Sequence, residues 1–169
     1  QDDAPDAAPA PGQAATPVSG RRGAAQDYDR QPDAPFKGLT RLGVVVEGLG
    51  TQATTCGLRR DTIESAVMKQ LSGAGLEASL NSDEDTYVYV NVMTATLANG
   101  RCISRYDAFL NSHTTAGLEY HPSPVLLDVS LMHKGGLAAG AAAAHAESVM
   151  RGLQDYLGQF TARIRDANK

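Results

Sequence analysis

Hydrophobic and polar residues alternate with a period of two along residues 86–93, where valines at 88, 90 and 92 are separated by tyrosine or asparagine. This period predicts a half-buried β-strand with a valine face and a tyrosine face. The Asn99-Gly100 pair follows, and both residue types tolerate positive φ. We therefore expect a hairpin turn there and a returning strand over residues 102–110.

Three further segments have the character of strands. Residues 42–49 are apolar, rich in β-branched residues and bounded by glycine, which predicts a buried strand. Residues 77–80 predict a short strand. Residues 125–131 alternate again, so we expect Val125, Leu127, Val129 and Leu131 to face a core and the glycines of 135–140 to end the strand. Residues 50–57 are expected to form a loop. Residues 112–124 are expected to form a longer connection, or to be part strand and part loop.

Two segments have helical spacing instead. Asp61 and Glu64 stand three residues apart, as in a capping box, and precede an apolar stripe that a glycine at 73 or 75 ends. The segment 141–166 carries a longer apolar stripe and has arginines in its last turn. The expected order is β-α-β-β-β-β-α, an α+β fold with a mainly antiparallel sheet packed by two helices. The two stripes comprise Ile63, Ala66, Val67, Leu71 and Ala74, and Val149, Leu153, Tyr156, Leu157, Phe160 and Ile164.

Composition divides the chain into two parts. Residues 1–35 are rich in Ala, Pro, Asp and Gln and contain six acids and three arginines, so they carry −3 of the net charge of −4. We expect a disordered leader over 1–35 and a single α+β domain over 36–169. The chain starts at Gln1, which suggests a mature N-terminus left after removal of a secretory signal; a chain shortened in another way is the alternative.

Charge and hydropathy narrow the class of partner. A mildly acidic chain of pI about 5.5 lacks the basic face that binding to nucleic acid or to a membrane surface requires. It also contains no run of 18 apolar residues, so we expect no transmembrane helix. We expect the protein to be periplasmic or secreted.

Cys56 and Cys102 are the chain's two cysteines. In an exported protein we expect them to form a disulfide, and two separate buried thiols are the alternative. Closing a loop of this length stabilises a fold by about 4 kcal/mol when the effect is attributed to chain entropy. Neither cysteine has a Cys or His neighbour at the spacing typical of zinc ligands.

An acidic turn precedes the tyrosine strand. Asn81, Asp83 and Asp85 are spaced as at the start of an EF-hand loop, and Glu84 adds a third carboxylate. The EF-hand pattern then fails, because the sixth position is threonine and the twelfth is valine. We expect Asp83, Glu84 and Asp85, supported by Asn81, to bind a hard cation such as calcium or a lanthanide. A solvated turn held by local hydrogen bonds is the alternative.

The tyrosine face is the candidate for contact with a partner. Tyr87 and Tyr89 share one side of the strand, and a helix on the valine side would leave them for a second subunit, whereas a second helix on their own side would make them core. A homodimer through this face would bring two acidic turns together. Glu47, at the end of the first strand, is an exposed edge group or a functional acid.

Motifs typical of enzymes are absent, including the nucleophile elbow, the P-loop and the zinc-protease helix. The four histidines are not spaced for a helical metal site; His113, Glu119 and His121 in one connection are a weak candidate for a transition-metal site. We therefore expect a protein that is not an enzyme.

The motifs C-G-L (56–58), N-G-R-C (99–102) and R-I-R-D-A-N-K (163–169), in that order with the helices and strands between them, resemble those of small exported bacterial α+β proteins, most of which have no assigned activity. The acidic turn on such a body is similar to what is expected of the periplasmic lanthanide chaperone of methylotrophic bacteria. That resemblance implies a metal bound by carboxylates and metal-linked dimerisation.

Two functional hypotheses follow from the sequence. The first is a non-enzymatic periplasmic binding protein or chaperone for calcium or a lanthanide, in which the metal promotes a homodimer. The second is an accessory or interaction subunit of a bacterial envelope assembly without metal, bound to another periplasmic protein through the tyrosine face or a sheet edge.

Overall fold

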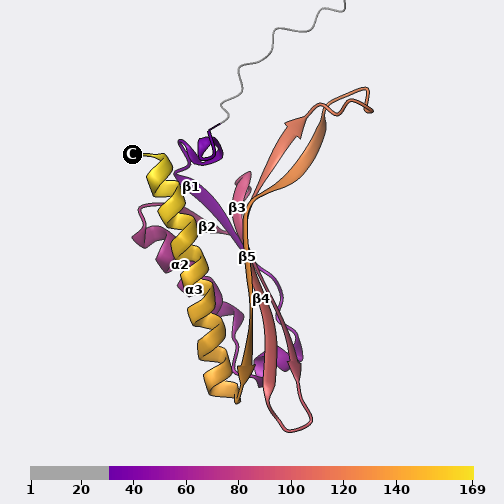
Figure 1. Ribbon diagram of the computed structural model, residues 1–169, viewed down its shortest axis with the longest axis vertical. Helices are drawn as coiled ribbons and strands as arrows, with labels where there is room; N and C mark the ends of the chain where they lie inside the picture. The colour runs from indigo at the N-terminus through magenta and orange to yellow at the C-terminus, as the bar shows by residue number, and fades with distance from the viewer. Residues whose placement is uncertain (1–30) are drawn as a thin grey trace, which may run out of the picture. The chain divides into compact units, whose positions relative to one another are not determined.

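A computed structural model of the protein describes residues 31–169 (Figure 1). The predicted leader lies outside the described residues as far as residue 30. The described part is an α+β fold with one five-stranded sheet, and the predicted order of strands and main helices is confirmed. The elements are η1 (Ala34–Phe36), β1 (Arg41–Val46), α1 (Thr51–Thr55), α2 (Arg60–Gly73), β2 (Glu77–Leu80), β3 (Thr86–Thr96), β4 (Cys102–Ala116), β5 (Val125–Gly140) and α3 (Ala142–Ala167).

The strands lie in the order β2-β1-β3-β4-β5. β1 pairs in parallel with both of its neighbours, over four residues each. The β3–β4 and β4–β5 ladders are antiparallel and run the full length of β3 and β4. Most of the paired residues are therefore antiparallel, as the sequence predicts.

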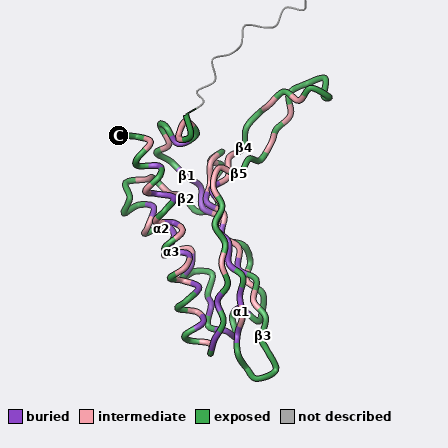
Figure 2. Tube along the Cα trace, viewed as in Figure 1, coloured by how far each residue is buried: buried purple, intermediate pink, exposed green. Residues whose placement is uncertain are grey.

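Both long helices pack on the same face of the sheet. α2 contacts β1 and β2, α3 contacts β4 and β5, and the two helices contact each other (Figure 1). The valines of β3 lie under them, the predicted helical stripes contribute eight further core residues, and β1, β4 and shorter segments provide the rest (Figure 2). None of the described helices is both long and apolar enough to cross a membrane.

Tyr106 connects α3 to the sheet. Its ring lies between Gly136 on β5 and Gly152 on α3, and a Cβ atom at either glycine would collide with it. A stacked contact with Tyr156, with ring centroids 5.7 Å apart, completes the packing. The glycines of 135–140 therefore continue β5 where the sequence predicts its end, because a side chain at Gly136 would push Tyr106 out of the core.

β4 and β5 form a hairpin that extends past the other strands. Its outer part, residues 112–129, is called the hairpin arm below; it projects beyond the helices and its turn is the end farthest from α3 (Figure 1). At the base of the arm a bulge between Leu110 and Asn111 leaves Leu131 without a paired residue on β4. Residues 112–116 of the predicted connection 112–124 are therefore strand, and residues 117–124 join β4 to β5.

The bulge changes which residues of β5 face the helices. Leu131, Met132 and Ala138 pack against the core, whereas Val129 is 38% exposed. The prediction that 125, 127, 129 and 131 all face a core is wrong for the arm, because no described helix extends over it and the period of two shifts by one residue at the bulge.

Two local predictions are also corrected. Residues 51–55 form one helical turn, α1, rather than a loop; this turn is stabilised by Ala53, which is buried in the core. The capping box is wrong, because α2 already begins at Arg60, with Arg59 at the N-cap and no side-chain cap. Asp61 instead accepts a hydrogen bond from the backbone of Thr62 within the first turn.

Candidate functional site: the open face of the sheet

The face of the sheet opposite the helices carries the tyrosines and has no described helix over it (Figures 1 and 2). Registered pairing places its side chains in rows that cross several strands. One row joins Val45, Tyr89, Phe109 and His133. We call this surface the open face.

Both tyrosines named by the sequence lie on the open face and bind acids through their hydroxyl groups. The Tyr89 hydroxyl donates to Oε2 of Glu47 at 2.7 Å, and the Tyr87 hydroxyl donates to Oδ2 of Asp128 at 3.0 Å. The hydrogen bond to Glu47, together with burial, raises the pKa of Tyr89 to about 12. Glu47 is thus an edge acid that holds a tyrosine at the end of β1. Each of these two tyrosine rings on the open face is therefore held at its hydroxyl group by one carboxylate.

Asp107 lies at the centre of the open face and is almost fully buried, with 4% exposure. Nε of Arg105 donates to its Oδ2 at 2.9 Å, and Nε2 of His133 lies 2.9 Å from its Oδ1. Burial raises the pKa of Asp107, but the hydrogen bonds from Arg105 and His133 outweigh it, so the pKa lies below its ordinary value. The carboxylate is charged and paired at neutral pH.

His133 is held on two sides. Its ring stacks on Phe109, with centroids 4.1 Å apart and an interplanar angle of 9°. Gly135 is opposite Asp107, and a Cβ atom at that position would collide with the carboxylate. The cluster borders a surface hollow that Gly136 and Leu137 complete. The cluster therefore presents a carboxylate, a guanidinium and an imidazole to this hollow, and the hydrogen bonds of Asp107 and His133 among the described residues involve no hydroxyl or thiol.

Large apolar side chains are exposed at both ends of the sheet. Met93 and Leu137 flank Arg105 in one row of the open face and are 57% and 73% exposed. With Leu97 in the β3–β4 turn they form the sheet-end patch. At the other end of β4, the arm patch consists of Tyr120 and Leu126, which are 85% and 72% exposed, whereas Val129 lies on the opposite side of the arm.

The acidic turn between β2 and β3 does not converge on one point. Glu84 forms an ion pair with Arg41, at 2.7 Å from its Nη2, whereas Asp83 and Asp85 are exposed and have no side-chain partner among the described residues. Asn81 adopts a positive φ of 48° at the start of the turn. The four residues do not form a compact set of ligand atoms in the described chain. Cation binding by this turn stays a prediction of the sequence.

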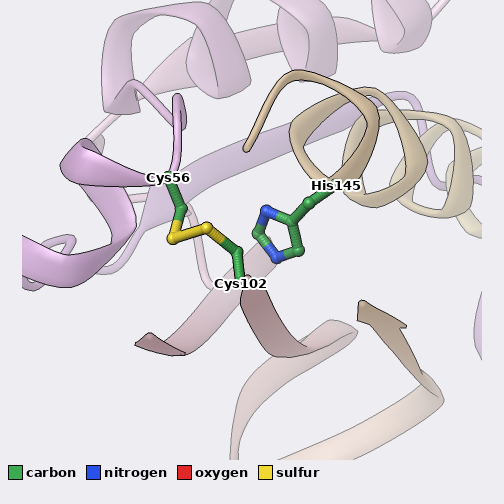
Figure 3. A group of neighbouring side chains, drawn as sticks. All are labelled: Cys56, Cys102 and His145. Atoms are coloured by element: carbon green, nitrogen blue, oxygen red, sulfur yellow. A yellow bond between two sulfur atoms is a disulfide. The ribbon is translucent and has the colours of Figure 1, made fainter. Parts of the chain in front are cut away.

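Cys56 and Cys102 form the predicted disulfide, which joins the end of α1 to the start of β4. His145 lies next to it, with one ring nitrogen and both sulfur atoms within 4.8 Å of one another (Figure 3). Sequence reasoning missed this neighbour. His145 follows Cys102 by 43 positions, and only the packing of α3 on β4 brings the two together.

The remaining histidines are spread along the hairpin. His113 lies against Tyr87 with ring centroids 5.3 Å apart, and His121 caps the arm turn through Ser123. Together with Glu119 they do not form a compact ligand group among the described residues. His133, which the sequence analysis does not single out, is part of the charged cluster on the open face. Its pairing with Asp107 depends on the β4–β5 register, which local patterns do not encode.

Comparison with known proteins gives only remote similarity. No protein-family model matches the chain, and no curated protein matches it. Solved structures that are similar include a PelC dodecamer from Paraburkholderia phytofirmans, at 12% identity over 75% of this chain and 86% of that chain, with a TM-score of 0.39. A minor lipoprotein from Acinetobacter baumannii is similar at 12% identity over 75% of this chain and 92% of that chain, with a TM-score of 0.32. Similarity at this level does not establish a common function, and neither structure bears on the resemblance to the lanthanide chaperone.

Proposed function

We propose that this protein is a non-enzymatic interaction subunit of an exported bacterial assembly, and that its first partner is a second copy of the same chain. The observation that carries the proposal is the presence of two exposed apolar patches on one sheet. The sheet-end patch and the arm patch lie at opposite ends of β4 and cannot meet within one chain. Exposed apolar groups that cluster in this way are typical of contact surfaces.

The placement of the patches favours a head-to-tail contact. A two-fold dimer formed through either patch alone covers that patch and leaves the other exposed. A head-to-tail contact joins the arm of one copy to the sheet end of the next and covers both. Such a contact produces a ring or a chain of subunits, in place of the homodimer that the sequence suggests.

The polar groups of the open face suit the same role. Arg105 lies between Met93 and Leu137 and keeps its guanidinium partly exposed while it holds Asp107. A buried, paired carboxylate below an exposed arginine holds that arginine in a fixed position, which gives a contact surface a defined charge pattern. The disulfide supports an oxidising compartment, as expected for an exported protein.

The proposal is tested with the full chain by sedimentation velocity over a range of protein concentrations. We expect the wild type to form species larger than a dimer. The arm variant Leu126→Asp and the sheet-end variant Leu137→Asp each lose one surface, so each alone is expected to be monomeric. Mixed one to one, they are expected to form a dimer, because each retains the surface that the other needs.

The control is Gln159→Asp, which adds the same charge on the exposed side of α3 and should assemble like the wild type. A wild type that stays monomeric at every concentration overturns self-association. A mixture that stays monomeric, although the wild type assembles, overturns the head-to-tail geometry and favours a two-fold contact.

A further inference from the structure

Cys56, Cys102 and His145 form the most compact group of metal-ligating side chains among the described residues. All three are buried, at 0%, 2% and 0% exposure. They come from three elements: the end of α1, the start of β4 and the first turns of α3. The fold therefore holds two sulfur atoms and one imidazole together in a place that solvent does not reach (Figure 3).

The imidazole of His145 has one engaged nitrogen and one free nitrogen. Nε2 lies 2.8 Å from Oγ of Ser104, which is itself 2.6 Å from Oγ1 of Thr94. Nδ1 is buried and has no hydrogen-bond partner among the described residues. A buried polar atom without a partner costs free energy, so such an atom calls for a ligand or a specific role.

This arrangement is the one found around metal-bound histidines. In metal sites the ring nitrogen that does not bind the metal is held by a hydrogen bond, which fixes the tautomer and the ring orientation. Ser104 provides that hydrogen bond here, and Nδ1 is left as the ligand atom. In the oxidised protein the sulfur atoms are bonded to each other, and the site lacks thiolates.

We propose that the reduced protein binds a thiophilic d¹⁰ cation, Cu(I) in the first place, through Cys56 Sγ, Cys102 Sγ and His145 Nδ1. Two thiolates bound to such an ion at about 2.3 Å lie roughly 4 Å apart. The sulfur atoms are 2.03 Å apart in the disulfide, so they must separate by about 2 Å after reduction. Thiolate ligands select Cu(I) and zinc over hard cations. Three buried ligands without an exposed fourth suit Cu(I), which accepts three-coordinate sites, better than tetrahedral zinc.

The disulfide and a bound metal ion exclude each other. A dithiol reductant transfers two electrons and two protons to the disulfide and becomes a disulfide itself, which leaves two thiols in the protein. Binding of Cu(I) then replaces thiol protons, which pass to solvent. Because the same sulfur atoms serve both purposes, the protein has either the disulfide or the metal. This site is distinct from the surfaces of the proposed assembly.

The experiment uses the full chain, reduced and separated from the reductant without oxygen, and titrated with Cu(I) against a competing chelator. We expect one Cu(I) per reduced wild-type chain and none per oxidised chain. In His145→Gln the amide still reaches Ser104 but Nδ1 is lost, and we expect an affinity lower by at least about tenfold. The double variant Cys56→Ser/Cys102→Ser is expected to bind no Cu(I) at this site.

Controls separate this site from other copper ligands. His121→Gln, in the exposed arm turn, should bind Cu(I) like the wild type. X-ray absorption of the loaded protein should show two sulfur ligands and one nitrogen ligand, and loading with Zn²⁺ in place of Cu(I) tests the choice of metal. Tighter binding of Zn²⁺ than of Cu(I), relative to the chelator, would overturn the assignment to copper.

Two results overturn the site itself. One is binding of Cu(I) to the oxidised protein. The other is equal Cu(I) affinity in the wild type and His145→Gln, whether or not reduction removes the native circular dichroism. If equal affinity comes with loss of the native circular dichroism on reduction, the metal binds only free thiols of an unfolded chain. None of these outcomes depends on subunit assembly, so the two proposals fail separately.

Discussion

Asp107 and His133 face each other across β4 and β5, with Nε2 of the histidine 2.9 Å from Oδ1 of the carboxylate. The pair occupies the middle of a surface that no described helix covers, and yet the carboxylate is 4% exposed. Arg105 above it and the absence of a side chain at Gly135 make this burial possible. The centre of the open face therefore behaves like a small polar core.

Asp107→Asn tests that polar core. We expect a loss of about 1–3 kcal/mol in the free energy of unfolding at neutral pH, because the buried partner of Arg105 and His133 loses its charge. Burial alone would raise the pKa of Asp107, and the two hydrogen bonds bring it below the ordinary 3.8. Its stabilisation is thus complete above about pH 4 and is lost as the pH falls through the lower folded-state pKa.

Denaturant melts at a series of acidic pH values measure this effect. The wild type should lose stability below about pH 4 more steeply than Asp107→Asn. The exposed and unpaired Asp83 supplies the control, since Asp83→Asn should follow the wild type throughout. Equal acid dependence of Asp107→Asn and the wild type would show that the carboxylate is not held by its neighbours.

Because Tyr89 is hydrogen-bonded to Glu47, we expect its hydroxyl group to lose its proton only at unusually high pH. Its hydrogen bond to Glu47, reinforced by burial, raises the pKa of Tyr89 to about 12. In Glu47→Gln the pKa should return toward the ordinary value of 10. The measurement is phenolate absorbance against pH, with the Tyr89→Phe trace subtracted to isolate this residue. Because the folded pKa is raised, the stabilisation is complete below pH 10 and is lost as the pH rises toward 12.

Gly136→Ala should destabilise the protein although it adds only a methyl group. The new Cβ would lie 2.6 Å from the Tyr156 hydroxyl and 2.7 Å from the ring of Tyr106, so both rings must move. We expect a cost of about 1–3 kcal/mol by chemical denaturation. Gly117→Ala is the matched control, because no atom lies within 4 Å of its Cβ. A neutral Gly136→Ala would mean that α3 adjusts freely against the sheet.

Removal of the disulfide should lower stability without changing the fold. Cys56 and Cys102 are 46 residues apart, and closing such a loop is worth about 4 kcal/mol at most if the effect is entropic. We expect Cys56→Ser/Cys102→Ser to show a native circular dichroism spectrum and a melting midpoint that is lower than that of the wild type. A chain that no longer folds would show instead that the bond is needed to place α1.

The cation hypothesis has its own test. Glu84 is engaged by Arg41, so the turn offers two free carboxylates from Asp83 and Asp85, and a hard cation prefers more oxygen ligands than these. We expect titration with calcium or a trivalent lanthanide to leave the mass by light scattering unchanged. Saturable binding that disappears in Asp83→Asn/Asp85→Asn would restore the hypothesis of a metal-linked dimer.

The sequence is most informative where one residue pattern sets one local structure. The valines of β3 and the stripe of α3 predict which faces are buried, because period two and helical spacing translate directly into burial. The disulfide follows from the count of cysteines and the expected compartment. These features depend on residues close in sequence or on a single possible pairing.

The rest depends on register and on contacts between distant elements. The Asp107–His133 pair requires the exact β4–β5 alignment, and the His145 neighbourhood requires α3 to pack over β4. From the sequence, Gly136 predicts the end of a strand. In the structure it continues β5, because the ring of Tyr106 occupies the space that a side chain at 136 would fill. Local sequence patterns do not specify which distant residues come into contact. The Asp107–His133 pair and the surroundings of His145 therefore become visible only in the folded structure.

The bulge at the base of the arm gives one unpaired residue control over direction. Leu131 is that residue, and beyond it Val125, Leu127 and Val129 lie on the side opposite Leu126 and Asp128. Deleting Leu131 would restore an unbroken ladder and leave those three residues on their present side, because Met132 and Ser130 already pair with consecutive residues of β4. The deletion would also remove a side chain that packs against the core. The extra residue therefore bends the hairpin at the base of the arm, and removing it would change the direction of the arm without changing which side chains share a face.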